Sequence, residues 1–129
     1  VDNRPSSKQK DLLSRIPDYA DTCLVSKRFV ARSDLAALTA LTGDEFALFT
    51  VGGRRKIVRG DDSGVPITPS KASELAEDRW RFSAHTHPGL GWPHNVPSDQ
   101  DKIILREFHP QTESVIVLPD GRWFVFSSD

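Results

Sequence analysis

Two strand–turn–strand patterns constrain the fold of this chain most strongly. Residues 45–51 are almost all apolar, as expected of a strand buried on both faces, and a Gly-Gly pair separates them from a more polar partner over 54–59. Near the other end, the apolar run 113–118 is followed by a Pro-Asp-Gly turn and by a second run over 122–126. Both patterns predict antiparallel hairpins.

Helical patterns alternate with these strands. An apolar stripe over 34–42, with Ser33 as the expected N-cap and Gly43 as the stop, predicts the first clear helix. Further along the chain we expect helices over 69–78 and 98–108 and a strand over 81–87. In a chain of 129 residues this order predicts one α/β domain built on a mixed sheet.

The first 22 residues differ in composition from the rest. Residues 1–10 are polar, so we expect residues 1–22 to be a linker-like segment and residues 23–129 to form the domain. A short helix over 11–16 fits within that segment, whereas residues 23–30 show at most a weak strand pattern. The chain starts at Val1 and contains no methionine, which favours a processed protein or a C-terminal module of a longer one.

Composition excludes several functional classes. With 17 basic and 18 acidic residues, the chain has no overall field that favours nucleic acid or a membrane surface. Cys23 is the only cysteine, so any metal site must use histidine and carboxylate ligands. No apolar run is long enough to cross a membrane, and no signal peptide is visible.

The segment His-Thr-His-Pro at 85–88 carries the strongest chemical signal. His85 and His87 stand two positions apart on an expected strand, so both imidazoles point to one face, with Phe82 and Ala84 on the other. A lone strand histidine is usually structural. When two histidines share one face, a metal site is as good an explanation as a structural role.

A hydroxyl and a carboxylate follow at the start of the next expected helix. Ser98 and Asp101 have the spacing of a capping box, although Glu or Gln is the usual partner. The helix dipole also favours the ionised form of Asp101, which a metal requires. Two histidines and one aspartate make a three-ligand zinc site with an open fourth position, which is typical of catalytic zinc.

The combination of His-Thr-His-Pro, a loop and Ser-x-x-Asp resembles the signature of the JAMM metallopeptidases, also called JAB1/MPN+ domains. The family motif includes a glutamate in the first strand after an N-terminal helix, and Glu45 occupies that place. A carboxylate at the edge of an apolar strand is otherwise hard to explain. The order of elements resembles the family from about Ser33 to Ser127, which implies a JAB1/MPN-like mixed, partly antiparallel curved sheet flanked by helices.

The resemblance also implies a role for each residue. His85, His87 and Asp101 would bind Zn²⁺, Glu45 would move a proton from the attacking water to the leaving amine, and Ser98 would donate to the oxyanion. The loop before Asp101 is longer than is usual in the family, which leaves Asp99 as an alternative ligand, but the Ser-x-x-Asp spacing favours Asp101. The expected function is hydrolysis of an amide or isopeptide bond in a protein or peptide, including a ubiquitin-like conjugate.

Two residues of the loop 89–97, Trp92 and His94, are candidates for substrate contact, although a solvated histidine is the more common alternative. A catalytically inactive scaffold of the same family is disfavoured because the ligands are present. A different class is a bacterial toxin or effector, because JAMM-like modules occur at the C-termini of large secreted proteins. Such a module would act in the cytoplasm of a target cell and would have an immunity protein as a partner. Its target would be a protein or, as the less favoured alternative on a chain of near-neutral charge, a nucleic acid.

Overall fold

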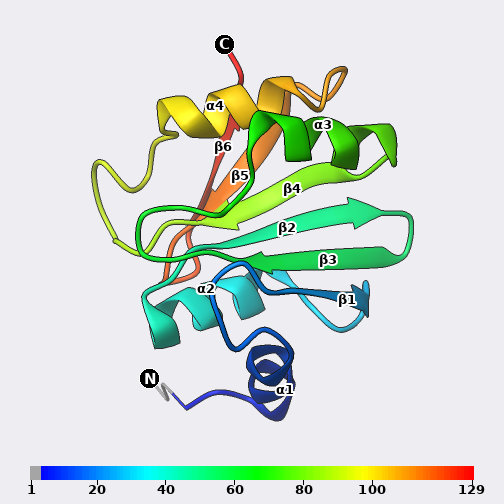
Figure 1. Cartoon of the computed structure of the whole chain (residues 1–129). Coiled ribbons are helices and arrows are strands. Elements are labelled where there is room, and N and C mark those ends of the chain that lie inside the picture. The colour runs from blue at the N-terminus through cyan, green and yellow to red at the C-terminus, as the bar shows by residue number, and fades with distance from the viewer. Residues whose placement is uncertain (1–3) are drawn as a thin grey trace.

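Six strands form one mixed sheet in the computed structural model, which describes residues 4–129 of the chain (Figure 1). The strand order is β1-β3-β2-β4-β5-β6. The elements of this described part are α1 (Ser7–Arg15), β1 (Thr22–Ser26), α2 (Arg32–Thr42), β2 (Phe46–Val51), β3 (Arg54–Arg59), α3 (Pro69–Glu77), β4 (Arg81–Thr86), α4 (Asp99–Arg106), β5 (Glu113–Val117) and β6 (Trp123–Ser127).

Both expected hairpins are confirmed. Strands β2 and β3 pair antiparallel from Phe46↔Arg59 to Val51↔Arg54, and β5 pairs antiparallel with β6. The contact between β4 and β5 is parallel, and α4 connects these two strands. The sheet is therefore mixed and partly antiparallel with helices on its faces, as expected from the sequence.

The sheet separates two apolar cores, and β2 contributes to both. Helices α1 and α2 cover one face, while α3 and α4 cover the other (Figure 1). Phe46 and Leu48 point into the α1/α2 core, and Ala47 and Phe49 point into the α3/α4 core. Burial on both faces explains why residues 46–49 of this strand are all apolar, and each large apolar side chain among them contributes roughly 1.5–3 kcal/mol to folding.

A β-bulge in β4 overturns one expectation about side-chain direction. Leu48 pairs with Ala84 but the adjacent Phe49 pairs with Phe82, so Ser83 is an extra residue in β4. Ala84 lies on the face opposite the histidines, as expected. The prediction for Phe82 is wrong, because the bulge turns this ring to the α3/α4 face, where it stacks on His85.

Helix α2 starts earlier than expected and is capped by a different residue. The helix begins at Arg32, so Ser33 is not the N-cap. Instead the carboxylate of Asp34 accepts a hydrogen bond of 2.8 Å from the backbone N–H of Ala31. Asp34 also pairs with Lys8 of α1 at 2.9 Å, and this contact fixes α1 against α2.

Part of the segment expected to be linker-like packs onto the sheet. Helix α1 begins with a capping box at Ser6, and Leu12 and Ile16 are fully buried in the α1/α2 core. Residues 1–3 of that segment lie outside the described residues, and the boundary at residue 23 stays a prediction. The undecided segment 23–30 contains most of the edge strand β1, which pairs with β3. No helix in the described part of the chain is both long and apolar enough to span a membrane.

Candidate metal centre

The imidazoles of His85 and His87 meet the carboxylate of Asp101 where β4 ends and α4 begins. The two Nε2 atoms lie 3.0 Å apart, and each lies 3.1 Å from one oxygen of Asp101. A tetrahedral zinc ion with bonds of about 2.0–2.2 Å would separate its ligand atoms by roughly 3.3–3.5 Å. The three groups therefore stand within a few tenths of an ångström of metal-ligand spacing.

His85 is the buried member of this group, with 1% of its surface exposed. Its ring stacks on Phe82 with centroids 5.3 Å apart and meets Phe126 edge-on at 5.6 Å. Its Nδ1 has no hydrogen-bond partner among residues 4–129. Within residues 4–129, the polar contacts of His85 are made by Nε2, which faces Nε2 of His87 and an oxygen of Asp101.

The loop backbone fixes the tautomer of His87. Its Nδ1 lies 2.7 Å from the carbonyl oxygen of His94, which can only accept a hydrogen bond. In the neutral ring the proton therefore sits on Nδ1, and the Nε2 lone pair faces an oxygen of Asp101 at 3.1 Å. Two acceptors at this distance require a cation between them, either a second proton on His87 or a metal ion.

Charge effects agree with that hydrogen-bond pattern. Burial alone would lower the pKa of His87, but the hydrogen bond to Asp101 and the negative charge of Glu45 outweigh it, so the pKa is raised. Burial likewise opposes ionisation of Asp101, but hydrogen bonds from His85 and His87 hold the pKa of this carboxyl well below its usual range. The donor set is thus an ionised carboxylate and two imidazoles, which suits zinc.

Ser98 and Asp101 form a capping box at the start of α4. The Oγ of Ser98 accepts from the backbone N–H of Asp101 at 3.0 Å, and the N–H of Ser98 donates to Oδ2 of Asp101 at 2.9 Å. The capping interpretation of Ser98 is therefore confirmed. Because its Oγ accepts in this cap, the hydroxyl proton of Ser98 is available to donate. Asp99 is exposed, whereas Asp101 touches both histidines, so the geometry favours Asp101 over Asp99 as the ligand.

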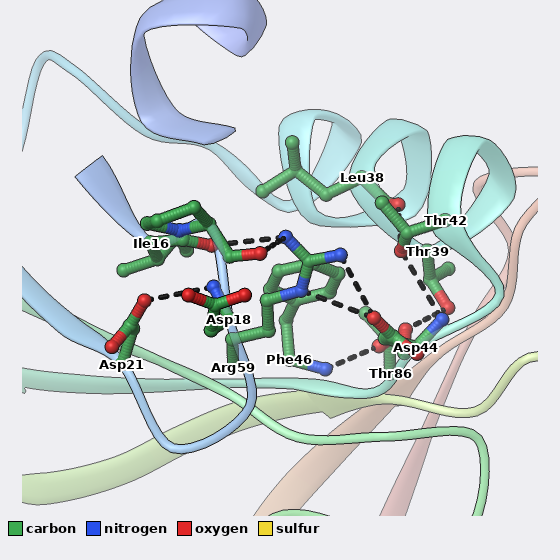
Figure 2. Close-up of polar contacts among 11 residues, drawn as sticks. Ile16, Asp18, Asp21, Leu38, Thr39, Thr42, Asp44, Phe46, Arg59 and Thr86 are labelled. Carbon is green, nitrogen blue, oxygen red and sulfur yellow. Dashed lines mark hydrogen bonds and ion pairs between the residues drawn. The ribbon is translucent and has the colours of Figure 1, made fainter. Parts of the chain in front are cut away.

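The residue before Glu45 is held by a network of polar contacts (Figure 2). Arg59 donates to Oδ2 of Asp44 through Nε at 3.0 Å and through Nη2 at 2.9 Å. The hydroxyl of Thr39 donates to the Asp44 carbonyl at 2.6 Å. The guanidinium of Arg59 also donates to the carbonyl of Ile16, so it links the end of α1 to the start of β2.

The backbone of Glu45 and of the residue after it is fixed as well. The N–H of Glu45 donates to the carbonyl of Asp61 at 2.8 Å, and its carbonyl accepts from Gly60 at 2.7 Å. The N–H of Phe46 donates to the hydroxyl of Thr86 at 2.8 Å, which links the start of β2 to the end of β4 (Figure 2). Glu45 is therefore held at a fixed position beside the histidines without using its own carboxylate.

The carboxylate of Glu45 faces the candidate metal position. Glu45, His85 and His87 each offer a ligand atom within 4.8 Å of the other two, and this buried group could hold a metal ion. Burial raises the pKa of Glu45 to about 7, against the opposing effect of His87. Asp101 lies 3.1 Å from Nε2 of both histidines, well within this separation, so its position favours Asp101 as the third ligand.

The loop between β4 and α4 folds back on itself beside His87. A Cβ atom added to Gly89 would lie 2.0 Å from Cδ2 of His94, so only glycine allows the His94 ring to pack there. With the ring packed there, the carbonyl oxygen of His94 lies within hydrogen-bond distance of Nδ1 of His87. Trp92 is 81% exposed at the tip of the loop. A substrate role for the side chains of Trp92 and His94 stays a prediction.

A cavity of about 370 Å³ opens in front of the centre. Glu45, His87, Ser98 and Asp101 are among the residues that line it. His85 does not line the cavity and stands behind the other ligands. A metal ion at this centre would thus face a space where a substrate can enter.

Comparisons with known proteins give no relative: no protein-family model, no curated protein and no solved structure matches the chain. The structure brings together the five residues proposed from the sequence: Glu45, His85, His87, Ser98 and Asp101. Sequence reasoning missed the ring of Phe82 beneath His85 and the carbonyl of His94 on His87. A bulge and a backbone contact leave no recognisable signal in a single sequence.

Proposed function

We propose that this chain is a zinc-dependent metallopeptidase of the JAMM type, which hydrolyses an amide or isopeptide bond. The observation that carries the proposal is the convergence of two Nε2 atoms and one carboxylate within 3.1 Å, at the wall of an accessible cavity. His85, His87 and Asp101 are the proposed ligands. Three protein ligands facing an open space suit a catalytic metal rather than a structural one.

The donor set favours zinc over the common hard cations. Calcium and magnesium prefer oxygen ligands and larger coordination numbers, whereas two imidazoles and one carboxylate suit zinc. The backbone contact from His94 to Nδ1 of His87 orients that ring, as outer partners of metal-bound histidines do. The hydrogen-bond donation from Ser98 N–H to Asp101 does the same for the carboxylate.

When bound, zinc supplies Lewis-acid chemistry: it acidifies water and polarises the substrate carbonyl. Glu45 accepts a proton from the attacking water, whose oxygen then bonds to the carbonyl carbon. The C–N bond breaks, and Glu45 returns the proton to the departing amine. A group with a pKa near 7 suits both halves of this exchange. The uncommitted hydroxyl proton of Ser98 is placed to stabilise negative charge on the carbonyl oxygen.

The test compares zinc-loaded wild-type protein with Glu45→Gln on a panel of peptides and ubiquitin-like conjugates. We expect cleavage by the wild type and a loss of at least about a hundredfold in Glu45→Gln, with zinc binding retained, because general acid–base catalysis typically contributes that much. Glu77→Gln is the matched control, since Glu77 is exposed on α3. Full activity in Glu45→Gln would refute the assignment, and no cleavage of any conjugate or peptide would refute the function.

A further inference from the structure

The cavity in front of the candidate metal centre has an apolar floor. Phe49, Phe82, Ile67 and Ile104 line it, and each is at most 6% exposed. They come from two strands, a loop and α4, so the floor belongs to the main core of that face. Its volume of about 370 Å³ lies within the range of small-molecule sites, which is roughly 300–1,000 Å³.

This apolar floor and the catalytic groups belong to one continuous space. Glu45, His87 and Asp101 line the same cavity as Phe49 and Ile104. A peptide whose carbonyl reaches the candidate metal centre therefore places a neighbouring side chain against the floor. The occupant follows from this continuity: it is the side chain of a residue next to the bond that is cut.

Two loops close the sides of the cavity, and both are held in place. In the loop after β3, a Cβ on Gly60 would lie 2.0 Å from the carbonyl oxygen of Gly64, so the turn is tightly closed. This loop contributes Val65 to the wall. The loop after β4 contributes Val96, which is 40% exposed at the rim. The walls exist before any ligand arrives.

The charges around the cavity exclude anionic occupants. Among the described residues that line it there is no lysine or arginine, whereas three carboxylates, those of Glu45, Asp62 and Asp101, face the space. A phosphate or carboxylate seated on the apolar floor, away from the candidate metal position, would meet these groups without a compensating cationic side chain. An uncharged apolar side chain would not be repelled by these carboxylates.

We propose that this cavity is a specificity pocket for a large aliphatic or aromatic side chain adjacent to the scissile bond. The inference rests on the proposed peptidase function, because that function makes a peptide the occupant. It adds a substrate class: the preferred peptides and conjugates carry leucine, phenylalanine or a similar residue next to the bond that is hydrolysed.

Fragment binding to metal-free protein tests the pocket without any catalysis. The probes are N-acetyl-leucinamide and N-acetyl-asparaginamide, which have similar shapes and differ in polarity. In an NMR titration of ¹⁵N-labelled protein, we expect the leucine probe to bind about tenfold or more tightly, with the largest shifts at Val65, Ile67 and Ile104. Equal affinities, or shifts centred elsewhere, would overturn the proposal.

Variants in the two loops locate the binding. Val96→Asp places a charge at the exposed rim and should weaken the leucine probe severalfold. Leu90→Asp is its matched control, because Leu90 is 53% exposed in the same loop and does not line the cavity. Val65→Asp should have a larger effect from the opposite wall. If Val65→Asp fails to fold, Val96→Asp decides, and equal effects of Val96→Asp and Leu90→Asp would contradict the pocket.

Cleavage profiling separates this inference from the function on which it rests. Zinc-loaded protein is given peptides that vary the residue on either side of the cut bond. Cleavage without an apolar preference would overturn the pocket while leaving the peptidase in place. Absence of all cleavage, with the leucine probe still bound at the floor, would remove the peptidase and leave an apolar binding site of the same specificity.

Discussion

Replacing Glu45 with glutamine should stabilise the metal-free protein at neutral and alkaline pH. Glu45 is only 8% exposed, and burial raises its pKa from 4.5 to about 7. Between these two values the folded protein holds a proton on Glu45 that the unfolded chain has released. The free energy of unfolding therefore falls as the pH rises through this window, and the stability of the protonated form is lost above pH 7.

The size of the effect follows from the same pKa. A rise from 4.5 to about 7 corresponds to a destabilisation of about 3 kcal/mol once Glu45 is ionised in both states. Glutamine has a similar shape and no charge, so Glu45→Gln avoids this destabilisation. We expect the two proteins to be about equally stable near pH 4.5, and the variant to be more stable by about 2–3 kcal/mol at pH 8.

Urea denaturation of chelator-treated protein from pH 4.5 to 8.5 measures this difference directly. Glu77→Gln serves as the control, because Glu77 is exposed and its replacement should change stability equally little at every pH. Zinc should shrink the difference, since a nearby cation favours the ionised carboxylate. A difference between wild type and Glu45→Gln that does not change with pH would refute the placement of an ionisable carboxylate in a desolvated position.

Two other substitutions test the supports of the site. Gly89→Ala should displace the His94 ring and its carbonyl from His87, and chelator competition should show zinc affinity reduced by about tenfold or more. Gly91→Ala in the same loop is the control: its added Cβ meets nothing within 4 Å, so zinc affinity should stay unchanged. Ser98→Ala and Ser6→Ala each remove the side-chain cap of a capping box, so each should lower the free energy of unfolding by about 1 kcal/mol. Only Ser98→Ala should also reduce kcat. Equal kcat values in the two variants would show that Ser98 has no part in catalysis.

The sequence predicts the hairpins and the direction of the two histidines because local patterns decide them. A Gly-Gly pair and a Pro-Asp-Gly turn fix the β2–β3 and β5–β6 pairings, whose residues are near one another in the chain. The alternation of side chains over two residues places His85 and His87 together. The spacing of Ser98 and Asp101 predicts the cap that forms.

The features that the sequence does not predict depend on distant contacts. The bulge at Ser83, which turns Phe82 beneath His85, arises from pairing with β2 and has no glycine or proline to mark it. The start of α2 depends on Asp34, which forms an ion pair with Lys8 of α1, a residue distant in the sequence. The polar composition of residues 1–10 favours a linker, whereas a few apolar residues further along, Leu12 and Ile16 among them, pack this segment onto the sheet.

Anomalous diffraction at the zinc edge, from crystals grown with zinc, would locate the metal ion. We expect one strong peak bonded to His85 Nε2, His87 Nε2 and a carboxylate oxygen of Asp101 at about 2.0–2.2 Å, with Glu45 facing the ion and not bonded to it. A peak that leaves these three ligands unbonded, or no peak at all, would contradict the proposed metal centre.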